Sequence, residues 1–245
     1  MLGILAALPE EITELLAEMG PTAEVHRIGM RDYHVGVLAG QPCVLVLTRI
    51  GKVAAAATTA MLLHAFGVRA VVFTGVAGGI HPRVQVGDVV IGDALLQHDL
   101  DARPLFPRYE VPLLARSHFA TEAALTALLG QCAADFLAGY AHGRAAQPAV
   151  HHGPIATGDC FVGDAVTLAR LREELPQALC VEMEGAAVAQ VCHEFGVPCA
   201  VLRTISDRAD NAAPVDFKRF LNEVASVYSA GILRRFLRAL PAPGG

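Results

Sequence analysis

Short apolar runs that alternate with longer amphipathic stretches along the whole chain constrain its fold most strongly. Residues 1–8 and Val71-Val72-Phe73 are apolar on both faces, which is typical of strands buried inside a sheet. An alanine-rich helical pattern at 51–66 lies between them. Buried strands alternating with helices indicate an α/β protein whose sheet is covered on both sides. We therefore expect a single-domain three-layer α/β/α sandwich with a mixed, largely parallel central sheet.

The same patterns place the individual elements and the limits of the domain. Strands are predicted at 2–8, 33–38, 43–48, 70–74, 88–97, 153–157, 179–183 and 199–205, and helices at 10–19, 51–66, 117–137, 163–174, 184–195 and 215–239. Residues 139–152 are rich in Ala, Gly, His and Pro, which predicts a connecting loop. We expect one domain over 1–240 and a flexible tail at 241–245.

Composition excludes several classes of partner and location. The chain has 245 residues, a net charge of −5 and no basic run, which argues against nucleic acid or an acidic membrane as a partner. No apolar run reaches membrane length, and the first eight residues are too short for a signal peptide. The six cysteines include no CxxC pair, which favours buried reduced thiols. We expect a cytoplasmic protein.

Two acidic stretches near the C-terminus indicate a chemical site. Val181-Glu182-Met183-Glu184-Gly185 opens a predicted helix, and Arg203-Thr204-Ile205-Ser206-Asp207 ends the strand that follows it. Ligands of α/β sheets bind where parallel strands end, so these carboxylates are expected to meet in one crevice. Each acid alone has a structural explanation as a helix cap or a dipole partner.

The N-terminus supplies further acids to the same edge of the sheet. Pro9-Glu10-Glu11 directly follows the first predicted strand. Both glutamates can be read as acids of a first helical turn, but one of them is expected to point into the crevice. The combination of acids from both ends of the chain favours a functional interpretation over a structural one.

Three other motifs do not support the chemistry they suggest. Ile50-Gly51-Lys52 is not a phosphate loop, because Val46 and Val53 replace the required glycine and hydroxyl residue. Thr74-Gly75-Val76-Ala77-Gly78-Gly79 lacks the dinucleotide fingerprint and is predicted to be a tight turn. His98-Asp99-Leu100-Asp101 has no partner at metal-ligand spacing, so a satisfied loop network is predicted and no metal.

An apolar loop with several prolines favours a subunit contact. Leu105-Phe106-Pro107 and Val111-Pro112-Leu113-Leu114 follow a strand end on the side of the predicted crevice. A loop of this kind is packed under its own domain or offered to another subunit, and its position favours the second interpretation.

The ordered set of motifs resembles the 5′-methylthioadenosine/S-adenosylhomocysteine nucleosidases of the nucleoside phosphorylase and nucleosidase family. The resemblance covers nearly the whole chain, through Pro9-Glu10-Glu11, Ile50-Gly51-Lys52-Val53-Ala54-Ala55, Thr74 to Gly79, Gly87-Asp88-Val89-Val90, Thr157-Gly158-Asp159, Val181 to Glu184 and Ser206-Asp207. It implies a nucleoside phosphorylase-like fold, hydrolysis of the bond between adenine N9 and ribose C1′, no metal or redox cofactor, and a homodimer.

The resemblance also implies roles for individual residues. Asp207, with Ser206 beside it, protonates adenine N7, while ionised Glu11 activates the water and ionised Glu184 holds the ribose hydroxyls. Phe161 stacks on adenine, the Val162 backbone reads its edge, Met183 flanks the sugar, and Arg203 orients Glu11 or the water. The remaining substrate-binding candidates are Ala77, Gly78, Glu182 and Phe217. The candidates for covering the alkylthio pocket of a partner subunit are Ile50, Ala102, Leu105, Phe106 and Pro112.

Two departures from the family pattern and three rival functions remain. Val76 stands where a serine is common, and Leu8-Pro9 where a methionine and an acid are usual. A purine nucleoside phosphorylase would need cations to hold phosphate, for which Arg49 and Arg203 are the obvious candidates. An aminofutalosine hydrolase could use the same site. A non-catalytic nucleoside-binding protein is the third alternative.

Overall fold

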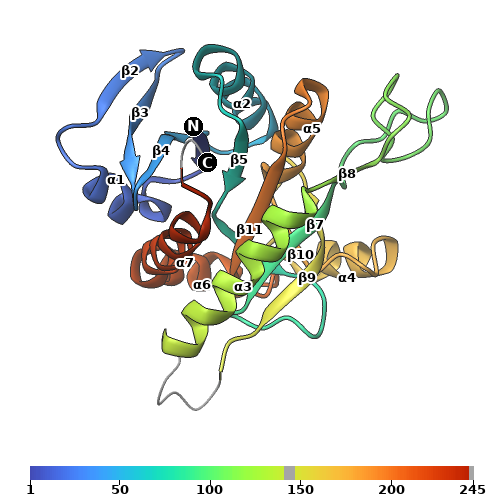
Figure 1. Ribbon diagram of the computed structural model, residues 1–245. Coiled ribbons are helices and arrows are strands. Elements are labelled where there is room, and N and C mark those ends of the chain that lie inside the picture. The colour runs from blue at the N-terminus through green and yellow to red at the C-terminus, as the bar shows by residue number, and fades with distance from the viewer. Residues whose placement is uncertain (141–146, 243–245) are drawn as a thin grey trace.

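The computed structural model describes residues 1–140 and 147–242 and contains one mixed sheet with helices on both sides (Figure 1). The strands are β1 (Leu2–Ala6), β2 (Glu24–Ile28), β3 (Arg31–Leu38), β4 (Gln41–Leu47), β5 (Ala70–Phe73), β6 (Val76–Gly79), β7 (Val89–Gln97), β8 (His118–Ala120), β9 (Val150–Thr157), β10 (Cys180–Glu182) and β11 (Cys199–Asp207). The α-helices are α1 (Thr13–Met19), α2 (Lys52–Phe66), α3 (Ala123–Tyr140), α4 (Ala165–Glu174), α5 (Gly185–Phe195), α6 (Ala213–Phe220) and α7 (Ser226–Ala239).

The strand order places the first and the last strand of the chain near the middle of the sheet. The order is β2-β3-β4-β1-β5-β11-β6-β10-β9-β7-β8, and β11 also pairs with β7. β1 pairs in parallel with β4 and β5, and β5 pairs in parallel with β11. The β2–β3, β3–β4 and β7–β8 pairs are antiparallel. The sheet is therefore mixed, as predicted.

The two faces of the sheet belong to different hydrophobic clusters. Leu5 and Val201 pack in one cluster with residues of α2 and α5. Their neighbours Ile4 and Leu202 point the other way, into a cluster with residues of α1, α3 and α7. Successive strand residues alternate between faces, so each face is covered by its own helices (Figure 1). This confirms the three-layer α/β/α arrangement.

The prediction of a helix at 117–137 is wrong at its start. His118–Ala120 forms strand β8 against β7, and α3 begins only at Ala123. The Thr121 hydroxyl donates to the Gly92 carbonyl, and the Glu122 carboxylate accepts a hydrogen bond from the Leu125 amide. The first contact holds the chain against β7 and the second caps the start of α3, and an alanine-rich sequence does not reveal either.

Three further elements differ from their predictions. The glycine-rich segment at 76–79 is strand β6 rather than a tight turn, because its small residues fit between β10 and β11. Strand β2 was not predicted, since most of its residues are exposed. The helical region predicted at 215–239 contains a π-helical segment, Leu221–Ala225, between α6 and α7.

The predicted loop at 139–152 and the predicted tail can be followed only in part. The first two loop residues end α3 and the last three belong to β9, whereas 141–146 lie outside the described residues. In the tail, 243–245 also lie outside them, and the Pro241 carbonyl accepts a hydrogen bond from Gln41. Within the described part of the chain, no helix is long and apolar enough to cross a lipid bilayer.

Candidate active site

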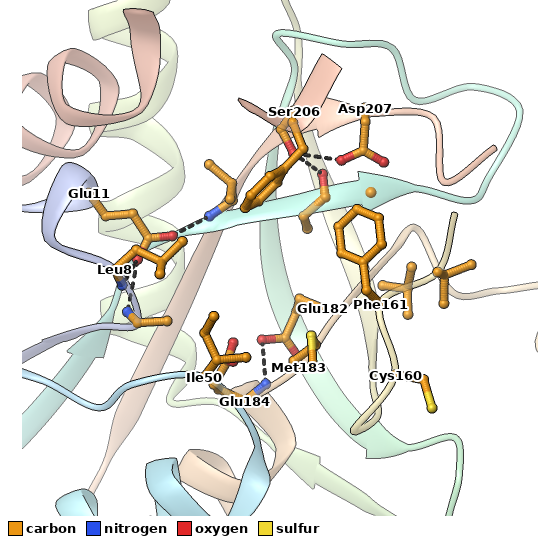
Figure 2. Close-up of a pocket in the computed structure, with 17 residues that line it drawn as sticks. Leu8, Glu11, Ile50, Cys160, Phe161, Glu182, Met183, Glu184, Ser206 and Asp207 are labelled. Atoms are coloured by element: carbon orange, nitrogen blue, oxygen red, sulfur yellow. Dashed lines mark hydrogen bonds between the residues drawn. The ribbon is translucent and has the colours of Figure 1, made fainter. Parts of the chain in front are cut away.

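A pocket of about 320 Å³ opens where β1, β10 and β11 end (Figure 2). Leu8 and Glu11 lie at one side of it, Phe161 and Asp207 at the other, and Glu184 between them. Residues from opposite ends of the chain thus share one cavity, as the sequence predicts. The predicted site residues that line it are Glu11, Ile50, Ala77, Gly78, Phe161, Val162, Glu182, Met183, Glu184, Ser206, Asp207 and Phe217.

The remaining predicted residues do not line this pocket. Arg203 lies behind it, and the four candidates from the 98–117 loop, namely Ala102, Leu105, Phe106 and Pro112, lie elsewhere on the chain. Five further residues line the pocket without having been assigned to it: Ala7, Leu8, Val76, Cys160 and Val181. Each is within four residues of a predicted one, so sequence proximity is the signal that could have found them.

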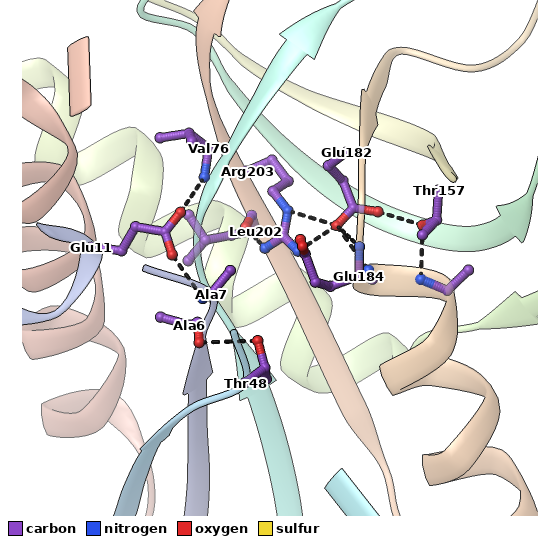
Figure 3. Close-up of polar contacts among 12 residues, drawn as sticks. Ala6, Ala7, Glu11, Thr48, Val76, Thr157, Glu182, Glu184, Leu202 and Arg203 are labelled. Atoms are coloured by element: carbon purple, nitrogen blue, oxygen red, sulfur yellow. Dashed lines mark hydrogen bonds and ion pairs between the residues drawn. The ribbon is translucent and has the colours of Figure 1, made fainter. Parts of the chain in front are cut away.

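The Glu11 carboxylate is held in place by backbone amides. Its Oε2 accepts hydrogen bonds from the amides of Ala7 at 2.8 Å and Leu8 at 2.9 Å, and its Oε1 accepts one from Val76 at 3.1 Å (Figure 3). Burial raises the pKa of Glu11, and the amides and nearby Arg203 offset only part of that rise. Because both lone pairs of Oε2 are occupied, a proton can be accepted only at Oε1.

Glu182 and Arg203 form a buried ion pair. Arg203 Nη2 lies 2.6 Å from Glu182 Oε2, and both side chains are almost completely buried (Figure 3). The same oxygen accepts the amide of Gly185 at 2.8 Å, while Oε1 accepts the Thr157 hydroxyl. Burial by itself lowers the pKa of Arg203, but the charge and hydrogen bond of Glu182, together with the charges of Glu184 and Glu11, outweigh this and raise it.

This ion pair changes the interpretation of both residues. The Glu182 carboxylate is fully engaged within the protein, so it positions the start of α5 and Arg203 rather than offering its oxygens to a ligand. The Arg203 guanidinium lies over the Phe73 ring at 4.0 Å. Its charge also acts on Glu11 and Glu184, and offsets part of the rise that burial causes in the pKa of each. Arg203 therefore supports both glutamates from behind the pocket.

Glu184 is the residue before α5, and its side chain faces the pocket instead of capping its own helix. Oε1 accepts the amide of Gly51 at 2.8 Å, at the start of α2. Burial and then the negative charge of Glu182 raise the pKa of Glu184 to about 8. The unliganded site therefore favours the protonated form of Glu184 more than water does.

Asp207 ends β11 at the other side of the pocket, where burial raises its pKa despite two hydrogen bonds that act in the opposite direction. Oδ2 accepts the Ser206 hydroxyl at 2.8 Å, and Oδ1 accepts the Ala209 amide at 2.8 Å. An acid of this kind is suited to donate a proton near neutral pH.

Aromatic side chains complete the Asp207 side of the pocket. Phe161 and Phe217 meet edge to face with ring centroids 5.7 Å apart, and Val162 lines the same pocket. Phe161 remains 48% exposed, so its ring surface is available to a planar ligand. The pocket thus pairs an apolar aromatic end with carboxyl groups along the rest of its wall.

The loop network predicted around His98 is present only for its aspartates. Asp99 pairs with Lys52 at 2.6 Å and Asp101 with Arg103 at 2.5 Å. His98 Nε2 is buried and has no hydrogen-bond partner among the described residues. In the same part of the chain, no group of three or more His, Cys, Asp or Glu side chains is placed to hold a metal ion.

Comparisons with known proteins agree with this architecture. A family model described as the phosphorylase superfamily matches residues 1–238. The 5′-methylthioadenosine/S-adenosylhomocysteine nucleosidase of Shewanella oneidensis is 36% identical to this chain, covering 98% of it and 97% of the relative. The chain belongs to the methylthioadenosine/S-adenosylhomocysteine nucleosidase family of the phosphorylase superfamily. The predicted family is therefore confirmed.

Solved structures show the same family and fold. The Neisseria meningitidis nucleosidase in complex with methylthio-immucillin-A is 33% identical, with a TM-score of 0.87 and coverage of 98% of this chain and 99% of that one. A futalosine hydrolase from Helicobacter pylori is 37% identical, with a TM-score of 0.86 and coverage of 98% and 97%. The nucleoside phosphorylase-like fold and the nucleosidase class of enzyme are both confirmed at the level of the family.

Proposed function

We propose that this protein hydrolyses the N-glycosidic bond of 5′-methylthioadenosine and S-adenosylhomocysteine and releases adenine. One observation carries the proposal: Glu11, Glu184 and Asp207, each more than nine-tenths buried, line a single pocket. The related enzymes named above, and the nucleoside analogue bound to one of them, support the same substrate class.

The pocket orients the substrate by chemical type. The aromatic side chains of Phe161 and Phe217 suit the adenine ring, which places its N7 near Asp207. The ribose then lies between Glu11 and Glu184, and Met183 flanks it. In this orientation the 5′ substituent points toward Leu8 and Ile50, at the side of the pocket away from Asp207 (Figure 2).

Acid and base groups at these positions account for the reaction. Asp207 donates its proton to N7, so that adenine leaves as a neutral molecule when the N9–C1′ bond breaks. The sugar becomes positive in the transition state, and carboxylates beside it stabilise that charge. Water forms the new bond to C1′ and gives its proton to Glu11 Oε1, the oxygen whose second lone pair is unoccupied.

Water rather than phosphate is the attacking group in this proposal. Phosphate binding requires several cationic donors. Arg203 is committed to Glu182 and to the Leu202 carbonyl, and Arg49 does not line the pocket. Aminofutalosine is the second candidate substrate, favoured by the likeness to the Helicobacter pylori futalosine hydrolase.

We also propose that two copies of the chain assemble, with the loop at 98–117 of one covering the pocket of the other. Leu105 is 83% and Leu113 is 90% exposed on this loop, although both are apolar. Arg108 holds the loop to α4 through two hydrogen bonds to Glu174, at 2.9 and 2.8 Å. The partner would receive Ala102, Leu105, Phe106 and Pro112, and Ile50 of its own chain would complete the alkylthio subsite.

The test is adenine release from methylthioadenosine, S-adenosylhomocysteine and aminofutalosine in phosphate-free buffer. We expect Asp207→Asn and Glu11→Gln each to lower kcat by at least about a hundredfold, since each removes a group that transfers a proton. Circular dichroism and substrate-binding measurements show whether each variant is folded. Release that requires added phosphate would make the protein a phosphorylase, and tight binding without release would make it a binding protein. Near-normal turnover of either variant would remove that residue from its proposed role.

A further inference from the structure

A second groove adjoins the active-site pocket across a shared wall. It has a volume of about 550 Å³, and Ala7, Leu8 and Ile50 line both cavities. The rest of its lining comes from α1, from the β2–β3 hairpin and from the segment after β4. Because the 5′ substituent points toward Leu8 and Ile50 in the proposed orientation, this groove lies where a long substituent would continue beyond the ribose.

The groove is locally basic although the protein as a whole has a net charge of −5. Arg27, Arg31 and Arg49 line it, and Asp32 is the acidic residue in its lining. Arg27 lies 3.7 Å from Asp32, so this pair is neutral in sum. The other two arginines have no ion-pair partner among the described residues, which leaves two positive charges at the groove.

Among the residues that the structure describes, Arg31 and Arg49 are held by backbone carbonyls alone. Arg31 donates to the carbonyls of Gly29, Thr48 and Ala54, and its buried Nε has no partner in the described part of the chain. Arg49 Nη2 donates to the Met30 carbonyl at 2.5 Å. Carbonyl oxygens orient a guanidinium without neutralising its charge, so both groups are preorganised for an anion.

Ile50 belongs to the wall that the two cavities share, and Arg49 precedes it in the chain. Ile50 lines both cavities, whereas Arg49 lines the groove alone. The backbone on both sides of Ile50 is left-handed, with φ angles of 70° at Arg49 and 97° at Gly51. A substituent that passes Ile50 therefore enters the groove that Arg49 lines.

We propose that this groove is a subsite for a carboxylate at the far end of the 5′ substituent. The proposal rests on the proposed nucleosidase function and specifies its substrate class. Two nucleosides supply this chemistry, the homocysteinyl group of S-adenosylhomocysteine and the benzoate of aminofutalosine. Methylthioadenosine, whose substituent ends in a methyl group, reaches the apolar wall but not the arginines.

The first experiment compares S-adenosylhomocysteine with its carboxamide, which has the same shape without the negative charge. We expect Arg49→Gln to lower kcat/KM for S-adenosylhomocysteine by about five- to tenfold, since a charge-assisted contact is lost. The carboxamide and methylthioadenosine should change less than about twofold, because an exposed charge contributes little to binding a neutral group. Arg49→Lys should recover part of the loss. Arg69→Gln, an exposed arginine outside this groove, is the matched control.

The second experiment repeats the comparison with aminofutalosine and identifies the source of the carboxylate. A lower kcat/KM of Arg49→Gln with either acidic substrate, or with both, supports the subsite and shows which substituent it holds. An equal fall in kcat/KM for acidic and neutral substrates, or no fall for the acidic ones, would overturn the proposed subsite. Arg31→Gln gives a second variant with the same expectation, and its melting temperature shows whether it folds. If wild-type protein releases adenine from no substrate, the nucleosidase proposal fails instead.

Discussion

Individual glycines make room for the reactive carboxyl groups. A Cβ atom built on Gly75 would lie 2.9 Å from Glu11 Oε1 and 3.1 Å from Arg203 Nη1. One on Gly78 would lie 2.9 Å from Asp207 Oδ1 and 3.0 Å from the Ala209 Cβ. The two distances to carboxylate oxygens are shorter than normal contacts of a Cβ atom, so a side chain at Gly75 or Gly78 would displace the acid beside it. The glycine-rich strand thus acts through the absence of side chains.

We predict that Gly78→Ala lowers kcat/KM at least about tenfold and destabilises the protein by about 1–3 kcal/mol, as overpacking usually does. Adenine release and urea unfolding measure the two effects. Gly139→Ala is the control, because a Cβ there meets nothing within 4 Å and alanine favours the helix. Full activity of Gly78→Ala would show that Asp207 tolerates displacement.

At this scale the sequence identified the acids but not their connections. The spacing of the motifs predicted that Glu11, Glu184 and Asp207 would share a crevice, and they line one pocket. The pairing of Arg203 with Glu182 was not predictable, because it depends on the side-chain packing between β10 and β11. The raised pKa of Glu184 depends on the same packing, since burial and the charge of Glu182 cause it.

Among the elements, the long regular segments were predictable and the short edge strands were not. α2 and α5 begin and end within one residue of their predicted positions, because glycines mark their ends. β2 alternates little between apolar and polar residues, and β8 is three residues long. Strands of this kind are specified by their neighbours rather than by their own pattern.

The connection at 98–117 is expected to mediate the contact between two copies of the chain. We expect Leu105→Asp to weaken dimerisation and to raise KM for methylthioadenosine severalfold, because it places a charge in an apolar contact. Light scattering over a range of concentrations measures the assembly. Val166→Asp is the control, since Val166 is similarly exposed, at 81%, but lies on α4. A wild-type protein that is monomeric at high concentration would contradict the proposed assembly.

For the whole molecule, burying several acids ties stability to pH. Glu184 has an ordinary pKa of 4.5 and a pKa of about 8 in the folded protein, and the pKa values of Glu11 and Asp207 are also raised. Between these values the folded state retains protons that the unfolded chain releases. The stabilisation that the retained proton on Glu184 gives the folded state is therefore fully present below about pH 4.5. It is lost as the pH rises toward about 8.

We predict that the free energy of unfolding falls between about pH 5 and pH 8, by at most about 1.4 kcal/mol per pH unit for one proton. Glu184→Gln should flatten this dependence, because the amide has no proton to lose. Urea unfolding at several pH values measures it, with Glu173→Gln, an exposed residue of α4, as the control. An unchanged slope in Glu184→Gln would contradict the raised pKa.

The order of the strands has a consequence for synthesis on the ribosome. β1 is made first, but it lies between β4 and β5, and β5 in turn needs β11 beside it. Pairings this distant along the chain close slowly, so translation of the C-terminal part must be nearly finished before the interior is complete. Premature termination before Asp207 would therefore leave an inactive fragment with open strand edges, prone to aggregation and a substrate for chaperones and proteases.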